Sequence, residues 1–212
     1  MSLFALDPFE NLLPFDGDVN YFGSLFTRGQ CKQLYHTLFN EIHWESDQVQ
    51  INGKMIQTKR QVSWHGDSNQ IYRYSGSIKH AKKWTDTLLE LKAIVEAKTG
   101  ESFNSCLLNY YADGEHQMAW HSDNEQELGS TPVIASLSLG ATRKFSFKHK
   151  QNKHTCSIEL EDGGLMIMKG DTQQHWLHSL PADVKCRDGR INLTFRVIDH
   201  AKYNNYQTRL HE

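Results

Sequence analysis

The chain has 212 residues, of which 23% are charged and 38% hydrophobic, and its formal net charge is -2. These values describe a globular domain that can bury a core, and they exclude a fibre or a disordered tail. Because the charge is close to neutral, binding to nucleic acid would require a local basic patch.

The N-terminal segment carries Asp7 and Glu10 among its apolar residues and has no basic stretch before them. We therefore do not expect a signal peptide. No apolar run approaches the roughly 20 residues of a membrane span. The four cysteines form no C-x-x-C pair, which argues against a zinc ribbon. We expect a monomeric protein that does not contact membranes and is cytoplasmic, or nuclear in a eukaryote.

The first hundred residues contain two stretches with helical periodicity and a hairpin between them. Apolar residues recur at helical spacing over 27–42, with Thr27 as a plausible N-cap. An Asn-Gly dipeptide flanked by alternating residues predicts an exposed β-hairpin over 49–54. A second helix is predicted over Ile78–Thr99, where Gly100 would end it.

After Gly100, short runs rich in β-branched and aromatic residues dominate. They predict strands at Phe103–Tyr111, Val133–Leu139, Lys144–Lys148, Leu165–Met168 and Ile191–Ile198. No helix is long enough to cross between them, so the pattern favours an antiparallel double sheet such as a jelly roll. We expect a mainly β, α+β fold, with the split near residue 100.

The last predicted strand has two contrasting faces. Its period of two places Ile191, Leu193, Phe195 and Val197 on one side and Arg190, Asn192, Thr194 and Arg196 on the other. A solvated polar face is the ordinary interpretation in antiparallel sheets. Two arginines framing Asn and Thr also suit a dicarboxylate, because guanidinium groups bind carboxylates bidentately.

A second polar constellation is the triplet His121-Ser122-Asp123. On extended backbone, the imidazole and the carboxylate point to the same side and can reach one ion. A third ligand would complete the two-histidine, one-carboxylate set of non-heme iron oxygenases. His175 and His178 are both candidates, and spacing does not choose between them. A zinc hydrolase is an alternative, against which the two arginines argue.

Together these motifs resemble the AlkB family of Fe(II)- and 2-oxoglutarate-dependent dioxygenases over roughly residues 45–200. Within it the chain is similar to the branch that repairs alkylated double-stranded DNA. The resemblance is carried by Asn109-Tyr110-Tyr111, His121-Ser122-Asp123, His175-Trp176-Leu177-His178-Ser179-Leu180-Pro181 and Arg190-Ile191-Asn192-Leu193-Thr194-Phe195-Arg196, and by Pro132-Val133-Ile134-Ala135-Ser136 and Gly140-Ala141 with Arg143.

The resemblance implies a double-stranded β-helix core over 101–200. Residues 1–100 would provide N-terminal helices and a nucleotide-recognition hairpin lid, and 201–212 a C-terminal tail. The implied iron ligands are His121, Asp123 and His178, which selects His178 over His175. The implied 2-oxoglutarate site is Asn109, Tyr111, Arg190, Asn192, Thr194 and Arg196.

The activity implied is oxidative dealkylation of N-alkylated bases in DNA, such as 1-methyladenine or 3-methylcytosine. It would use Fe(II), 2-oxoglutarate and O₂, and would release succinate, CO₂ and an aldehyde. Two alternatives stay open. The same core could act on RNA or on a substrate other than nucleic acid, or the chain could be a non-enzymatic β-sandwich that binds a metal.

Substrate contacts are implied in two regions, and base flipping is the expected route to a base in a duplex. The implied residues are Asn52, Gly53, Lys54, Tyr72, Arg73, Tyr74, Asn124 and Glu125. Asn52 stands where the duplex-repairing branch has an aromatic wedge, and Asn124 stands where it has an acid, so strand preference is open. For phosphate contacts we expect two basic clusters: Arg143, Lys144, Lys148, Lys150 and Lys153, and Lys79, Lys82 and Lys83.

Overall fold

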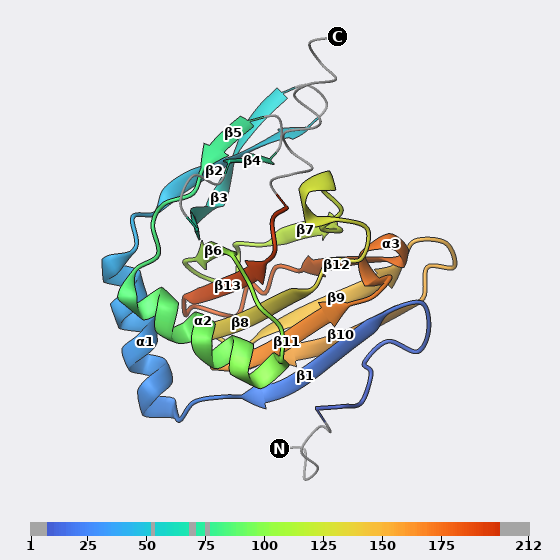
Figure 1. The fold of residues 1–212 in the computed structure, drawn as a ribbon, viewed down its shortest axis with the longest axis horizontal. Helices are drawn as coiled ribbons and strands as arrows, with labels where there is room; N and C mark the ends of the chain where they lie inside the picture. Colours follow the sequence, from blue (N-terminus) through green and yellow to red (C-terminus); the bar gives the residue numbers. More distant parts are fainter. Residues whose placement is uncertain (1–7, 52–53, 68–70, 75–76, 200–212) are drawn as a thin grey trace.

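The computed structural model describes residues 8–51, 54–67, 71–74 and 77–199, with backbone only at 48–51, 54–56, 71–74 and 77–80. Two β-sheets pack face to face, and helices α1 (Arg28–Glu41) and α2 (Asp86–Thr99) cover the outer face of the larger one (Figure 1). No helix in the described part is long and apolar enough to cross a membrane.

All pairs in both sheets are antiparallel. The seven-stranded sheet has the order β1 (Asp18–Ser24), β11 (Gly164–Lys169), β8 (Ile134–Gly140), β13 (Arg190–Arg196), β6 (Ser105–Tyr111), β3 (Lys54–Gly66) and β2 (Glu45–Ile51). The four-stranded sheet has the order β10 (Thr155–Leu160), β9 (Arg143–His149), β12 (Trp176–Leu180) and β7 (Met118–His121). This mainly β, α+β double sheet confirms the predicted fold class, and each predicted strand after Gly100 is present.

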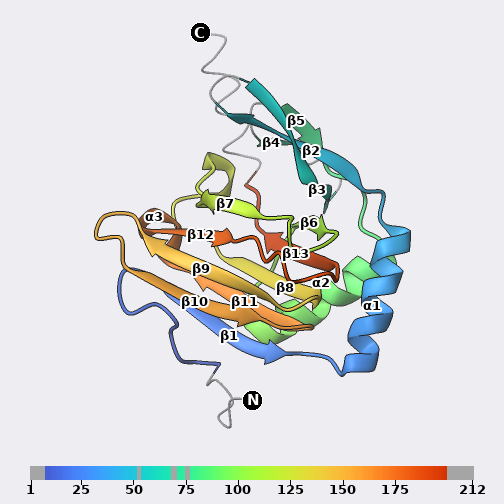
Figure 2. The same ribbon diagram turned by 180° about the vertical axis from the view of Figure 1, so that it is seen from behind.

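Short elements complete the chain. A separate hairpin pairs β4 (Ile71–Tyr74) with β5 (Ser77–His80), and the turns η1 (Gln126–Leu128) and α3 (Thr172–His175) precede β8 and β12. Both views place β4 and β5 beside β2 and β3, beyond the sheets at the end where β7 lies (Figures 1 and 2). The β2–β3 pairing over 49–54 confirms the predicted hairpin, although Asn52 and Gly53 lie outside the described residues.

The first predicted helix is confirmed, and the second is half right. Thr27 caps α1 in a reciprocal capping box with Gln30. The second helix begins only at Asp86, with Thr85 as its N-cap, and it ends at Gly100 in the left-handed conformation that favours glycine. Residues 77–80 instead form β5, because cross-strand pairing with β4 takes their backbone hydrogen bonds away from a helix.

The apolar face of β13 forms the centre of the core. Ile191, Leu193 and Phe195 are fully buried in a cluster that includes the inner faces of α1 and α2. Burying each such side chain contributes about 1.5–3 kcal/mol. Val197 was expected on this face but is 46% exposed, because the strand ends at Arg196. The polar face of β13 therefore points the other way, into the space between the sheets.

Three strands of the first hundred residues, β1, β2 and β3, belong to the same sheet as later strands. Strand β1 pairs with β11, and β3 pairs with β6. The predicted division near residue 100 therefore runs through one continuous sheet.

Candidate metal centre and dicarboxylate pocket

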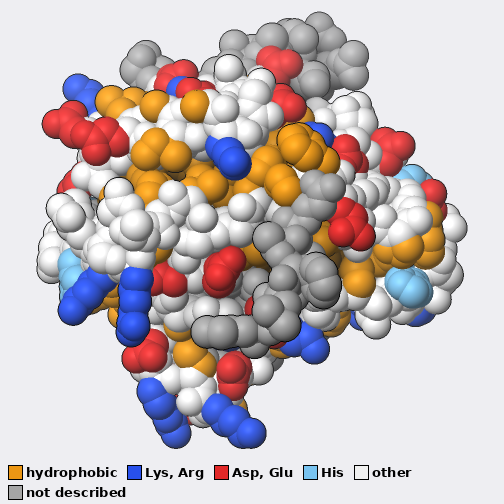
Figure 3. Space-filling view, turned by 90° about the horizontal axis from the view of Figure 1, so that it is seen from below, with side chains coloured by type: hydrophobic (Ala, Val, Ile, Leu, Met, Phe, Trp, Pro, Cys, Tyr) orange, Lys and Arg blue, Asp and Glu red, His pale blue; other side chains and the backbone are white. Residues whose placement is uncertain are grey.

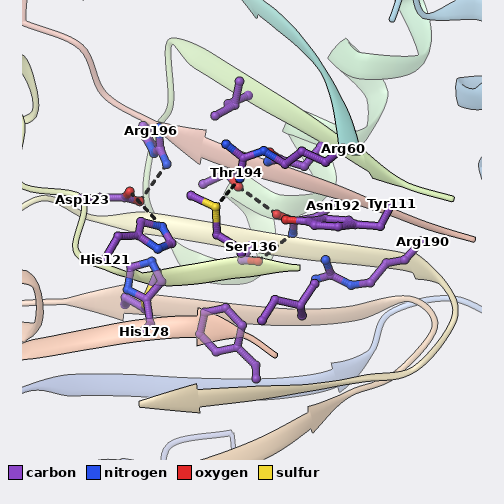
Figure 4. Close-up of a pocket in the computed structure, with 16 residues that line it drawn as sticks. Arg60, Tyr111, His121, Asp123, Ser136, His178, Arg190, Asn192, Thr194 and Arg196 are labelled. Atoms are coloured by element: carbon purple, nitrogen blue, oxygen red, sulfur yellow. Dashed lines mark hydrogen bonds and ion pairs between the residues drawn. The ribbon is translucent and has the colours of Figure 1, made fainter. Parts of the chain in front are cut away.

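Two histidines and one aspartate meet where β7 and β12 pair. His121 and His178 are direct partners across this antiparallel pair, and Asp123 follows β7 by two residues. One potential ligand atom from each of the three lies within 4.8 Å of the others. Figure 4 shows the three side chains converging at one end of a cavity between the sheets.

Neighbouring groups orient two of these three side chains. The Nδ1 of His121 donates to the Ala119 carbonyl at 2.8 Å, so a neutral ring leaves its Nε2 lone pair free for a metal. Asp123 accepts a 2.7 Å hydrogen bond from Arg196 through Oδ2, and its backbone N–H donates to Gln173 Oε1 at 2.9 Å. These contacts hold the ligand set in place before any ion binds.

The protonation states suit a metal at neutral pH. Burial, with help from nearby His121, lowers the pKa of His178 to about 3. Burial alone would raise the pKa of Asp123, but Arg196 and the two histidines outweigh it and hold that pKa below its ordinary value. His178 is therefore neutral and Asp123 ionised, which are the forms that ligate a cation.

His175, which spacing could not separate from His178, lies in a different cluster. It ends α3, and its potential ligand atom groups with those of Asp16 and His149. The register of β12 against β7 brings His178, not His175, opposite His121.

The other end of the cavity carries a buried arginine. Arg190 is 2% exposed, its Nη2 donates to Ser138 Oγ at 2.8 Å, and its guanidinium carbon lies 5.5 Å from the centre of the Tyr111 ring. Its Nε has no hydrogen-bond partner, and no described acid forms an ion pair with it. Burial lowers its pKa to about 10, which leaves it cationic at neutral pH.

Between the two ends, a polar layer lines the cavity. Thr194 Oγ1 donates to Asn192 Oδ1 at 3.0 Å, and Asn192 Nδ2 donates to Ser136 Oγ at 2.8 Å. Asn109 lies directly across from Asn192 on β6. All six residues expected to hold a dicarboxylate line this one cavity, so the polar face of β13 is not solvated.

These residues fit an iron ion and a dicarboxylate cosubstrate. The ligand set matches the open facial triad of non-heme iron sites. An uncompensated buried guanidinium with an unsatisfied Nε fits a carboxylate, because burying a charge without a partner is costly. The metal-ligand cluster lies at one end of the cavity and Arg190 at the other end, so a bound iron ion and Arg190 could together hold both ends of a dicarboxylate (Figure 4).

Sequence reasoning missed Arg60, which also lines the cavity from β3. It is 3% exposed, and its Nη2 lies 2.6 Å from Asp47 Oδ2 in a buried ion pair. No motif marks this pair in the sequence, because Arg60 reaches the cavity only through the pairing of β3 with β6, and Asp47 reaches Arg60 only through the pairing of β2 with β3. The apolar lining was missed as well: Leu107, Met118, Phe145, Met168 and Leu180.

The predicted substrate residues are placed less completely. Asn124 is exposed and Glu125 is half-buried with a buried Oε2 that lacks a hydrogen-bond partner, and neither lines the cavity. The backbone of Tyr72, Arg73 and Tyr74 forms β4, and Lys54 begins β3, but their side chains lie outside the described part, as do Asn52 and Gly53 entirely.

The prediction that Arg143 contacts phosphate is wrong. It is 1% exposed and donates to the carbonyl oxygens of Asp113, Gly114, His116 and Pro181. Lys82 forms an ion pair with Glu45. Lys144 and Lys153 are exposed. The face in Figure 3 mixes acidic, basic and apolar side chains, and no single sign of charge covers it.

Comparisons with known proteins agree with this geometry. The family model described as "2OG-Fe(II) oxygenase superfamily" matches residues 18–196. "DNA oxidative demethylase ALKBH2" of Homo sapiens is 34% identical over 185 residues, which cover 82% of this chain and 71% of that protein. "Alpha-ketoglutarate-dependent dioxygenase alkB homolog 3" of Homo sapiens is 39% identical over 175 residues, which cover 78% and 60%.

The chain spans 66% of the length of the Bos taurus ALKBH2, to which it is 35% identical over 185 residues, or 82% of this chain. Among solved structures, "The structure of OsALKBH1" superposes with a TM-score of 0.56 at 16% identity, covering 84% of this chain and 97% of that chain. That likeness shows a shared fold.

Proposed function

The chain belongs to the 2OG-Fe(II) oxygenase superfamily and, within it, to the AlkB homologues, and from this membership we propose that it removes alkyl groups oxidatively from N-alkylated bases in DNA. Fe(II), 2-oxoglutarate and O₂ are the cofactor and cosubstrates of this family. The observation that carries the proposal is the cluster of His121, Asp123 and His178 opening onto a cavity whose far end is a buried arginine.

In this proposal, His121, Asp123 and His178 hold the iron. Arg190 binds the distal carboxylate of 2-oxoglutarate. The cavity between Arg190 and the iron is lined by Asn109, Tyr111, Asn192 and Thr194. Arg196 keeps Asp123 ionised and oriented. When bound, the iron would activate O₂, of which one oxygen atom would oxidise 2-oxoglutarate to succinate and CO₂ and the other would hydroxylate the alkyl carbon. The resulting N-hydroxyalkyl group leaves as an aldehyde.

The chain itself positions the reactants and excludes water. Phe145 stacks on His178 with ring centres 5.4 Å apart, and Met118 and Leu180 close the same side of the cavity. These apolar walls limit the entry of water to the metal end, where a reactive oxidant would otherwise be consumed.

Glu125 supports a cationic base as the substrate. Bases such as 1-methyladenine and 3-methylcytosine carry a positive charge, and Glu125 offers a half-buried carboxylate with an unpartnered Oε2 two residues beyond the ligand Asp123. We propose that Glu125 and Asn124 contact the base, together with Asn52, Gly53, Lys54, Tyr72, Arg73 and Tyr74.

The proposal extends to the state of the protein. We propose a monomer acting in the cytoplasm, or in the nucleus of a eukaryote. The four cysteines are free, which fits a reducing compartment.

The test compares oligonucleotides that carry 1-methyladenine in single-stranded DNA, double-stranded DNA and RNA. Wild type with Fe(II), 2-oxoglutarate and O₂ should demethylate a DNA strand, and Asp123→Ala should not, because it removes a ligand. Demethylation of the RNA oligonucleotide alone would contradict DNA as the substrate and favour RNA, the second candidate. Succinate formation without demethylation of any oligonucleotide would contradict the nucleic-acid proposal while leaving the oxygenase core standing.

A further inference from the structure

A second cluster of metal-ligating side chains lies outside the iron site and shares no residue with it. We propose that Asp16, His149 and His175 bind a divalent transition metal, with Zn²⁺ as the expected ion. His149 ends β9, His175 ends α3, and Asp16 belongs to the segment before β1. One potential ligand atom from each lies within 4.8 Å of the others, the same spacing that the iron triad meets.

The distances in this cluster fit tetrahedral zinc. Two ligand atoms bound tetrahedrally at about 2.0–2.1 Å from Zn²⁺ lie about 3.3–3.4 Å apart. The Nε2 of His149 lies 3.4 Å from Asp16 Oδ2. The rings of His149 and His175 are nearly parallel, at 8°, with centres 6.1 Å apart. The ligand atom of His175 lies within 4.8 Å of the other two, so His175 must approach them to complete three protein ligands.

A buried, unsatisfied nitrogen points to a missing ligand. His149 is 2% exposed, yet its Nε2 is buried and has no hydrogen-bond partner. Buried polar atoms without a hydrogen-bond partner are uncommon in folded proteins, and a bound cation satisfies a nitrogen lone pair of this kind. The Nε2 lies beside a carboxylate, so a cation there would satisfy both groups.

One contact must change when the metal binds. The backbone N–H of Asn152 donates to Nδ1 of His149 at 3.3 Å, which is a long hydrogen bond. A neutral ring that ligates through Nε2 carries its proton on Nδ1, so this bond opens and the turn after β9 shifts. The proposal therefore includes a small rearrangement of residues 150–153.

The ligand set identifies the metal and its role. Two imidazoles and one carboxylate suit Zn²⁺, and the half-exposed Asp16 side chain leaves room for water as a fourth ligand. Phe15, next to Asp16, packs its ring against His149 and Trp176, and its carbonyl accepts from Trp176 Nε1 at 3.0 Å. The ion would fasten the N-terminal segment to β9 and to α3, directly before the strand that carries His178.

The test counts metal ions in a protein whose iron site is disabled. Asp123→Ala removes an iron ligand, so Co²⁺ or Zn²⁺ titrated into this variant by calorimetry reports the second cluster. We expect one equivalent of Zn²⁺ to bind, and the Tm to rise by about 5 °C or more when Zn²⁺ is a hundredfold above its Kd. Adding His175→Ala to Asp123→Ala should abolish both effects.

Two further variants keep the result interpretable. Asp16→Asn, at a half-exposed position, should weaken Zn²⁺ binding without unfolding the chain, which circular dichroism checks. His154→Ala is the matched control, because His154 packs against the same Phe15 and Trp176 but lies outside the cluster. Absence of Zn²⁺ binding by Asp123→Ala, or equal loss in His154→Ala and His175→Ala, would overturn the proposal and leave the cluster a hydrogen-bonded latch. The Zn²⁺ stoichiometry and the rise in Tm do not depend on turnover, so both can be measured even if the protein has no activity on DNA.

Discussion

Arg190 is a buried cation with which no described acid forms an ion pair, and this imbalance is the clearest residue-level mark of a ligand. The free-energy cost of burying this charge in the free protein is offset when a carboxylate of the ligand binds to Arg190. Removing one charged partner of a buried ion pair between protein and ligand weakens binding of the ligand by about 2–5 kcal/mol. This loss lowers the affinity at least about 30-fold.

Arg190→Met should therefore raise the Kd for 2-oxoglutarate at least about 30-fold while leaving Fe(II) binding unchanged. The stability of the free protein should stay level or rise, because the substitution removes an uncompensated buried charge. Anaerobic calorimetry measures the affinity, and Arg187→Met, at an exposed position nearby, is the control. An unchanged Kd in Arg190→Met would place the cosubstrate elsewhere.

His178 makes stability depend on pH. Its folded-state pKa is about 3, whereas an unfolded histidine titrates near 6.5, so the unfolded chain binds the extra proton between these values. Stability is complete above about pH 6.5 and falls as the pH drops toward 3, by about 1.4 kcal/mol per unit.

In metal-free protein, the unfolding free energy should fall about 3 kcal/mol more between pH 6.5 and pH 4 in wild type than in His178→Gln. Urea denaturation with a chelator present measures both. Parallel pH profiles for the two proteins would show that His178 is not buried in its neutral form.

At the residue level, the sequence predicted what motifs encode locally. His121 and Asp123 are two apart and Arg190 to Arg196 lie on one strand, so period-two backbone brings each set together. Spacing could not choose between His175 and His178, because the choice depends on the register of β12 against β7. Arg60 and Asp47 were missed for the same reason.

At the level of elements, the cavity depends on three neighbouring strands. β6, β13 and β8 present polar residues in register toward the second sheet, and their apolar faces rest on α1 and α2. Periodicity predicted these strands and α1. It misplaced the start of α2, since the β4–β5 hairpin depends on pairing that helical periodicity does not reveal.

Asn52, which follows β2 in the sequence, should set the preference between single- and double-stranded DNA. Asn52 cannot stack in the gap left by a flipped base, whereas a phenyl ring can, and stacking contributes about 1–3 kcal/mol. Asn52→Phe should raise the ratio of kcat/KM on double-stranded to single-stranded DNA at least about fivefold. Asn52→Ala is the control, because it removes the amide without adding a ring. An equal ratio in wild type, Asn52→Phe and Asn52→Ala would show that residue 52 does not contribute to recognition of the strand type.

For the whole molecule, near-neutral charge means that the proposed DNA affinity must come from a local set of cations. The buried Arg143 cannot belong to that set, whereas Lys144 and Lys153 of its predicted cluster are exposed. Whole-molecule charge could not have revealed this, because burial of a particular arginine depends on the four carbonyls that surround it.

If about six phosphates are contacted, a plot of log K for binding of duplex DNA against the logarithm of the salt concentration should have a slope of about -5. Lys144→Gln and Lys153→Gln should each reduce its magnitude by about 0.9 if that lysine contacts a phosphate. Fluorescence anisotropy across a salt series measures the slope. A flat salt dependence would be incompatible with phosphate contacts.

The most direct measurement is the ratio of formaldehyde to succinate when O₂ is admitted to anaerobic protein loaded with Fe(II), 2-oxoglutarate and a DNA oligonucleotide containing 1-methyladenine. A ratio close to one is expected, because each methyl group oxidised consumes one 2-oxoglutarate. Asp123→Ala should yield neither product. Steady succinate without formaldehyde would contradict the claim that alkylated bases in DNA are the substrate.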